Sequence, residues 1–138
     1  MFVLDTNVVS ELRKSPTGKA NPKVISWARS VPIGSLFLSA ITILELELGV
    51  LLVERKDATQ GRALRQWLNS AVVPAFENRV LTVDIAVARQ CAKLHVPNPR
   101  SERDALIAAT ALVHQMTVVT RNVADFEHTG VSVVNPWN

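Results

Sequence analysis

The chain has 138 residues, a length typical of one domain with one hydrophobic core. Hydrophobic residues make up 48% of it and charged residues 20%, a composition that supports a buried core and argues against disorder. Fifteen Lys and Arg against twelve Asp and Glu give a formal net charge of +3, which weakly favours a polyanionic partner. We expect residues 1–138 to form a single domain.

Cysteine content and hydropathy indicate the compartment. Cys91 is the only cysteine, so the chain forms no intramolecular disulfide and offers no thiolate cluster to zinc. The N-terminal residues lack the basic region of a signal peptide, and no apolar stretch approaches the roughly 20 residues that span a bilayer. We expect a cytoplasmic protein with no membrane contact.

Short β-branched runs alternate with longer helical patterns, which is typical of an α/β domain with a mainly parallel sheet. The pattern predicts strands at 2–4, 36–39, 80–83, 117–120 and 131–134. Helices are predicted at 6–13, 22–30, 41–55, 59–75, 85–95 and 102–115.

The first candidate site residue is Asp5, which directly follows the first predicted strand. Ligands of open parallel sheets collect at the carboxyl ends of strands, so this position suits a functional acid. Asp is also a frequent N-cap at a strand-to-helix turn, and that structural role stays open as the alternative.

The helix predicted at 41–55 carries Glu45 and Glu47, which point to nearly opposite sides because successive helical residues turn by about 100°. We expect Glu45 to lie on an inward-facing stripe and Glu47 to be peripheral. An ionised carboxylate on such a stripe is costly unless a cation or a donor meets it, so Glu45 is a candidate ligand. A buried salt bridge with an arginine is the alternative. The stripe comprises Ile41, Glu45, Leu48, Gly49 and Leu52.

Asp104 lies at the start of the helix predicted at 102–115. With Ser101 it has the spacing of a capping box, which is the structural alternative to a functional role. The apolar residues one turn further on, Ile107 and Ala108, place Asp104 on a face that points into the protein.

Asn122 and Asp125 follow the strand predicted at 117–120. Their spacing of three residues puts them on one face if the chain turns helically there. An Asn-capped turn with a solvated Asp125 is the alternative.

Taken jointly, the candidate acids predict a metal site. Clustered carboxylates repel by about 4 kcal/mol per pair at about 4 Å, even at a dielectric constant of about 20, so they need a compensating cation. The ligands are all oxygen atoms, which favours Mg²⁺ or Mn²⁺ over zinc. His95, His114 and His128 share no spacing that indicates zinc, and Cys91 is expected to be a small buried hydrophobe without a histidine at a useful spacing. Paired oxygen-ligated metals are a recurring means of phosphodiester cleavage, so we expect a nucleic-acid substrate.

The basic and aromatic residues are less informative. Arg13, Lys14, Arg100, Arg103 and Arg121 lie near the candidate acids in sequence and can hold phosphates, with solvated surface charge as the alternative. No basic and aromatic residues interleave in a way that suggests base stacking. For the three tryptophans, Trp27, Trp67 and Trp137, the core is the default expectation.

The candidate residues resemble the PIN domains, and among them the VapC-like and FitB-like toxins of bacterial toxin–antitoxin operons. The resemblance covers nearly the whole chain and implies a three-layer α/β/α domain with a mainly parallel sheet of about five strands. It lies in residues 2–7 (Phe-Val-Leu-Asp-Thr-Asn), in Glu45 with Gly49, in 104–109 and in 120–126.

The resemblance also implies the site and its chemistry. Asp5, Glu45, Asp104 and Asp125 would form an acidic pocket for one or two Mg²⁺ or Mn²⁺ ions. In the family, a metal-activated water attacks an RNA phosphate and leaves a 5′-phosphate and a 3′-hydroxyl. The residues that would support these ligands are Asn7, Thr120 and Asn122. Many PIN domains carry a further Asp at the position of Asn122, so this chain has one acid fewer for a second metal.

Family membership would bring two partners besides RNA: an antitoxin whose tail covers the pocket, and a second copy of the chain in a homodimer. Three other classes compete with this interpretation. A phosphohydrolase of the haloacid dehalogenase type needs a second Asp where this chain has Asn7. A catalytically silent nucleic-acid-binding PIN module would have lost site acids, and a pure interaction subunit would show no stabilisation by Mn²⁺.

Overall fold

The computed structural model describes residues 1–138. Five strands form one sheet in the order β3-β2-β1-β4-β5, and every neighbouring pair is parallel. The register places Phe2 beside Leu36 on one side and beside Thr117 on the other. The strands are β1 (Phe2–Leu4), β2 (Leu36–Ser39), β3 (Val80–Leu81), β4 (Thr117–Val119) and β5 (Val133–Val134). The predicted five-stranded parallel sheet is confirmed.

Seven α-helices and four short helical segments connect the strands. The α-helices are α1 (Thr6–Leu12), α2 (Pro22–Ser30), α3 (Ala40–Lys56), α4 (Ala58–Trp67), α5 (Val73–Ala75), α6 (Ile85–Leu94) and α7 (Glu102–His114). The short segments are 3₁₀ turns at Ser15–Thr17, Ile33–Ser35 and Val123–Phe126, and a π-helical segment at Leu68–Val72. None of the helices has the length and apolar character needed to cross a membrane.

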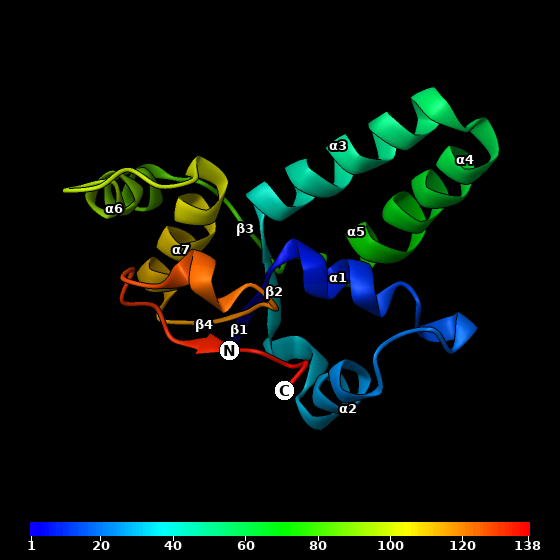
Figure 1. Cartoon of the computed structure of the whole chain (residues 1–138), viewed down its shortest axis with the longest axis horizontal. Helices are drawn as coiled ribbons and strands as arrows, with labels where there is room; N and C mark the ends of the chain where they lie inside the picture. The colour runs from blue at the N-terminus through cyan, green and yellow to red at the C-terminus, as the bar shows by residue number, and fades with distance from the viewer.

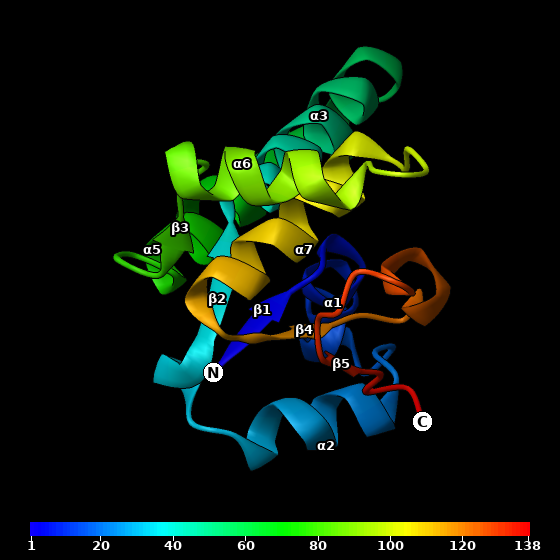
Figure 2. The ribbon, with the colours of Figure 1, turned by 90° about the vertical axis from the view of Figure 1, so that its left-hand side faces the viewer.

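The helices cover both faces of the sheet, with α6 and α7 on one side and α1, α4 and α5 on the other (Figures 1 and 2). Because side chains alternate along a strand, Leu4 and Val119 pack into the core cluster that includes α1 and α3. Val3 and Val118 point the opposite way, into the cluster that includes α7. The central strands are therefore buried on both faces, and the three-layer α/β/α arrangement is confirmed.

One predicted helix differs from the structure. The segment predicted as a single helix at 59–75 is helical throughout, but α4 passes into the π-helical segment before α5 begins. The amide of Val73 donates to the carbonyl of Leu68, a spacing of five residues. Pro74 has no amide hydrogen and its ring would clash with the carbonyl four residues earlier, which accounts for the wider turn just before it.

The predicted inward stripe of α3 is partly wrong. Ile41 is buried as expected, but Leu48 and Leu52 are 37% and 55% exposed. The buried side of the helix continues instead through Leu46 and Val50. The reason is tertiary: α3 projects away from the sheet beside α4, so only part of its surface meets the core (Figure 1).

Candidate active site

A pocket of about 450 Å³ lies at the carboxyl edge of the sheet, beside the ends of β1 and β4. The strand order runs one way from β1 to β2 and the other way from β1 to β4, and such a switch point is where α/β sheets bind ligands. Only one hydrophobic residue, Trp137, lines this pocket. The predicted site residues that line it are Asp5, Asn7, Glu45, Asp104, Asn122 and Asp125. We call it the acidic pocket.

Asp5 follows β1 directly and is only 7% exposed. Its Oδ1 accepts a hydrogen bond from the Thr6 amide at 2.8 Å, so Asp5 is also the N-cap of α1. Its Oδ2 accepts from the Thr120 hydroxyl at 2.8 Å. The two predicted roles of Asp5, helix N-cap and site residue, are compatible, because one carboxylate both caps α1 and lines the pocket.

Thr120 and Asn7 hold the Asp5 carboxylate from the side of β4. The Thr120 hydroxyl donates to Asp5 and accepts from the side-chain amide of Asn7 at 3.3 Å and from the backbone amide of Asn122 at 3.0 Å. Asn7 also donates to Asp5 Oδ2 at 3.4 Å, and its own oxygen accepts from the Arg121 amide at 3.3 Å. The hydroxyl has used its one donor and both acceptor positions, so the orientation of Asp5 is well determined.

Glu45 reaches the pocket from the second turn of α3. Its Oε1 accepts from the Thr6 hydroxyl at 2.6 Å, and its Oε2 lies 3.7 Å from an Arg103 guanidinium nitrogen. The arginine pair named as the alternative is thus present, but it is long and half-exposed, so it compensates the charge weakly. Glu47 points away and forms a two-pronged ion pair with Arg65, as its peripheral position predicted.

Asp104 lies in the first turn of α7, and Ser101 makes no side-chain capping bond there. Burial, followed by the charges of Asp125, Asp5 and Glu45 in that order, raises the pKa of Asp104 to about 6, against a small lowering effect of a hydrogen bond with Ser101. Burial also raises the pKa of Asp5, against the lowering effect of its bonds from Thr120 and Thr6. The charges of the other acids thus act on both Asp5 and Asp104.

Asp125 occupies the 3₁₀ turn at Val123–Phe126, where its backbone amide donates to the Asn122 carbonyl at 3.0 Å. Its side chain is exposed, in line with the solvated alternative, yet it stands on the pocket wall. Asn122 precedes the turn but makes no side-chain capping bond.

The residues of the acidic pocket fit a hard divalent cation. Five carboxylates line the pocket, and one of them, Glu11, is neutralised by Lys14 at 3.2 Å. For the four predicted acids, the distant Arg103 is the only basic side chain that forms an ion pair, and it does so with Glu45. The raised pKa values of Asp5 and Asp104 show that the carboxylates are poorly compensated. Since all donors are oxygens, the set suits Mg²⁺ or Mn²⁺.

Tertiary structure adds residues that sequence reasoning missed. Thr6 bridges Asp5 and Glu45 through its amide and hydroxyl. The Arg121 guanidinium stacks on Trp137 at 5.4 Å from the ring centroid, beside the pocket. This pair is not visible as a sequence pattern, because the fold brings together residues that are far apart along the chain. Arg13 and Trp67 form another such pair. The expectation of core tryptophans is therefore incomplete, since Trp137 packs on the core and also lines the pocket.

Comparison with known proteins agrees with this geometry. The PIN domain family model matches residues 2–131. The chain belongs to the PIN-domain family. VapC ribonuclease Y4jK of Sinorhizobium fredii is 38% identical over an alignment of 145 residues that covers 99% of this chain and 98% of the relative. Toxin FitB of Neisseria gonorrhoeae is 39% identical over 145 residues, which cover 100% of this chain and 99% of the relative. These two relatives confirm that this chain is similar to the VapC-like and FitB-like proteins, as the sequence motifs indicated.

A solved structure extends the comparison to three dimensions. The crystal structure of FitAcB from Neisseria gonorrhoeae matches with a TM-score of 0.89 at 35% sequence identity. The match covers 100% of this chain and 99% of that chain. The fold described above is therefore that of the FitB-like branch of the family.

Proposed function

We propose that this protein is a metal-dependent endoribonuclease and the toxin of a bacterial toxin–antitoxin pair, with residues 1–138 as a single PIN domain. The observation that carries the proposal is the acidic pocket, where carboxylates from four separate segments meet at the switch point of the sheet. A relative named a ribonuclease and another named a toxin, at 38% and 39% identity over nearly the full chain, support the activity.

Asp5, Glu45, Asp104 and Asp125 would hold one or two Mg²⁺ or Mn²⁺ ions. When bound, such an ion lowers the pKa of a water molecule and neutralises charge that develops on a phosphate. The chain's own residues supply the positioning. Thr120 and the Thr6 amide each occupy one Asp5 oxygen and fix the direction of its remaining lone pairs.

RNA is the proposed substrate. Lys14 and Arg121 line the acidic pocket and are placed to hold phosphates on either side of the reacting one. The half-buried ring of Trp137 lines the same wall and offers a face on which a base can stack. Asn122 lines the pocket with an amide where a carboxylate would have strengthened a second metal site, so we favour one tightly held ion.

An antitoxin and a second copy of the chain are the proposed protein partners. Apolar side chains on α3 are exposed to solvent, and an interface would bury them. The similarity to the FitAcB structure supports the antitoxin. Light scattering on the purified toxin tests the dimer, with a monomeric mass as the contrary result. The exposed side chains are Leu44, Leu48, Leu51 and Leu52.

Among the rival classes, the haloacid dehalogenase type is set aside by membership of the PIN family. A silent nucleic-acid-binding module and a pure interaction subunit are the remaining alternatives. Both are disfavoured because every predicted acid lines the pocket and two of them have raised pKa values, a cost that a protein without a metal has no reason to keep.

The test is cleavage of a labelled single-stranded RNA by antitoxin-free protein with Mg²⁺, with Mn²⁺ and with EDTA. The Asp5→Asn/Asp104→Asn double variant is run alongside, with Glu77→Gln as the matched control because Glu77 is exposed and distant from the pocket. Metal-dependent cleavage that the double variant loses and the control retains is the expected result. Full activity in the folded double variant would overturn the proposal.

A further inference from the structure

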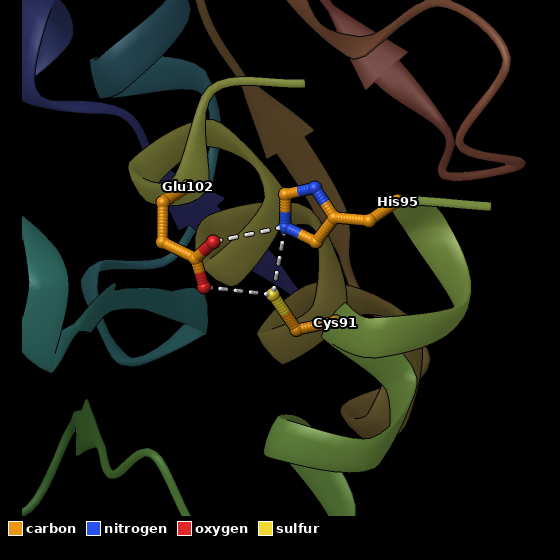
Figure 3. A group of neighbouring side chains, drawn as sticks. All are labelled: Cys91, His95 and Glu102. Carbon is orange, nitrogen blue, oxygen red and sulfur yellow. Dashed lines mark hydrogen bonds and ion pairs between the residues drawn. The ribbon is translucent and has the colours of Figure 1, made fainter. Parts of the chain in front are cut away.

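A second group of side chains with metal-binding atoms lies outside the acidic pocket (Figure 3). Cys91 lies on α6, His95 is the C-cap residue of that helix one turn further on, and Glu102, the first residue of α7, faces them. The expectation that Cys91 has no histidine at a useful spacing was wrong, since His95 follows it by four residues along the same helix face. We call these three residues the Cys91 cluster.

The distances within the Cys91 cluster are close to those of a metal centre. Cys91 Sγ lies 3.8 Å from His95 Nε2 and 3.7 Å from Glu102 Oε1, and His95 Nε2 lies 3.0 Å from Glu102 Oε2. Tetrahedral zinc with ordinary bond lengths to sulfur, nitrogen and oxygen needs donor atoms roughly 3.3 to 3.6 Å apart. Shifts of a few tenths of an ångström, within side-chain freedom, would bring the three donors to bonding distance from a central ion.

We propose that Cys91, His95 and Glu102 form a binding site for a divalent cation of the zinc type, separate from the acidic pocket. A thiolate and an imidazole select a softer ion than Mg²⁺ or Mn²⁺. Three protein ligands leave the fourth position to water or to an exogenous group. The proposal does not depend on the nuclease activity, since none of the three residues lines the acidic pocket.

The surroundings of the cluster suit a partly enclosed site with an entry path. Cys91 is 3% exposed and packs with Val87, Ala105 and Ala109, so its sulfur is held in place. The Glu102 side chain is 69% exposed, which leaves the cluster open to solvent on that side. Burial raises the pKa of the Cys91 thiol, so without a metal the sulfur keeps its proton and is no nucleophile.

Binding has a definite proton balance. Without a metal, His95 Nδ1 accepts from the Arg100 amide at 3.3 Å, so Nε2 carries the proton and donates to Glu102. Metal binding releases the thiol proton to solvent and moves the imidazole proton from Nε2 to Nδ1. The Arg100 amide then loses its acceptor, but the Arg100 guanidinium still anchors the loop through the carbonyls of Leu94 and Glu127 at 3.1 and 2.9 Å.

An ion in the Cys91 cluster would join the end of α6 to the start of α7. Glu102 lies two residues before Asp104 in the same helical turn, so the ion would also stiffen the turn that carries an acid of the nuclease site. We expect zinc to stabilise the folded protein, because an ion that binds only the folded state shifts unfolding by mass action.

The experiment uses the full chain, reduced, with excess Mg²⁺ present, and Co²⁺ as a spectroscopic substitute for Zn²⁺. Because Cys91 is the only cysteine, a thiolate-to-cobalt charge-transfer band in the near ultraviolet reports on this site alone. The expected result is a band that saturates at one equivalent of Co²⁺ and disappears when Zn²⁺, the tighter binder, is added. Zinc should also raise the Tm of the wild type. Cys91→Ala should abolish the band, and zinc should raise the Tm of this variant by less than it raises the Tm of the wild type.

Two variants separate this site from the acidic pocket and from a folding defect. Asp5→Asn/Asp104→Asn should retain the cobalt band, because its substitutions leave the cluster intact. Glu102→Gln alters a mostly exposed side chain and should weaken Co²⁺ binding by at least about tenfold with the fold preserved. Absence of the band in folded wild type, zinc stabilisation unchanged in Cys91→Ala, or unchanged Co²⁺ affinity in Glu102→Gln would each overturn the proposal.

Discussion

The acidic pocket and the Cys91 cluster each take one carboxylate from the first turn of α7, Asp104 and Glu102, yet their electrostatics are opposite. Of the four predicted acids in the acidic pocket, only Glu45 forms an ion pair, at 3.7 Å from Arg103, and the pKa of Asp104 rises to about 6. In the Cys91 cluster the Glu102 carboxylate already has a donor in His95 at 3.0 Å.

The contrast shows two ways in which a fold can prepare a site for an ion. In the acidic pocket, a hard cation would relieve the repulsion between carboxylates. In the Cys91 cluster, the side chains are already hydrogen-bonded to one another, so only a soft ion that displaces their protons would stabilise them further. Metal removal should therefore affect the two regions differently.

Loss of a pocket carboxylate should have the largest effect. Asp5→Asn is expected to lower metal-dependent RNA cleavage by at least about a thousandfold, because it removes a charge that would hold the ion and several kcal/mol of charge stabilisation with it. Single-turnover cleavage at saturating Mn²⁺ measures the loss. A fall of less than tenfold, with Glu77→Gln equal to wild type, would place the catalytic charge elsewhere.

Removal of a supporting hydroxyl should have an intermediate effect. Thr120→Val keeps the shape of the side chain but takes away the bond to Asp5 Oδ2, so activity and Mn²⁺ affinity should fall by about 10- to 100-fold. Thr120→Ser should restore most of both. Thr110→Val is the matched control, since Thr110 is equally buried but donates to the Leu106 carbonyl within its own helix. Equal losses in both valine variants would mean that the effect is general destabilisation.

The repulsion in the pocket should be visible as pH-dependent stability. Asp104 has a folded-state pKa of about 6 and a reference value of 3.8, so the folded state binds the extra proton between these values and the metal-free protein loses stability as pH rises through them. Above about pH 6 the folded protein bears the full free-energy cost of the ionised Asp104 carboxylate. Asp104→Asn lacks it and should be more stable than wild type at pH 7 in EDTA by about 1 to 2 kcal/mol, after allowance for partial exposure.

Urea unfolding at pH 7 and at pH 4 measures this difference. The advantage of Asp104→Asn should shrink toward zero at pH 4, because this pH is close to the reference pKa of 3.8, where the folded-state carboxyl is protonated and ionisation of the unfolded state gains little free energy. Excess Mn²⁺ should reverse the order at pH 7, because only the wild type retains every ligand. A metal-free variant less stable than wild type at pH 7 would contradict the poorly compensated pocket.

The smallest effect should come from the arginine at the edge of the acidic pocket. Arg103 is half-exposed and 3.7 Å from Glu45, so Arg103→Gln should change stability by no more than about 0.5 kcal/mol. The lost positive charge should tighten Mn²⁺ binding by about two- to threefold, within the same energy range. Calorimetric titration checks this, and weaker Mn²⁺ binding would mean that Arg103 orders Glu45 rather than competing with the ion.

Local signals in the sequence were enough for the strands and for most of the acidic pocket. Asp5 and Thr120 stand out because an apolar strand changes abruptly to polar residues, and parallel strands bring such ends to one edge. Glu45 was identified partly for a wrong reason, since the stripe that should have carried it inward exposes Leu48 and Leu52. The periodicity of α3 could not show that the helix leaves the sheet after its first turns.

The amino-acid sequence alone determined the α/β class, the parallel sheet and the identity of the acids, because these depend on short-range periodicity and on residues next to strand ends. Tertiary structure alone decided the contacts between distant segments: Thr6 with Glu45, Arg121 with Trp137, and Glu102 with Cys91. The spacing of Cys91 and His95 was readable along one helix, but Glu102 reaches them only through the path of the 95–101 loop. Such contacts depend on how elements pack and where loops return, which no local pattern in a single sequence specifies.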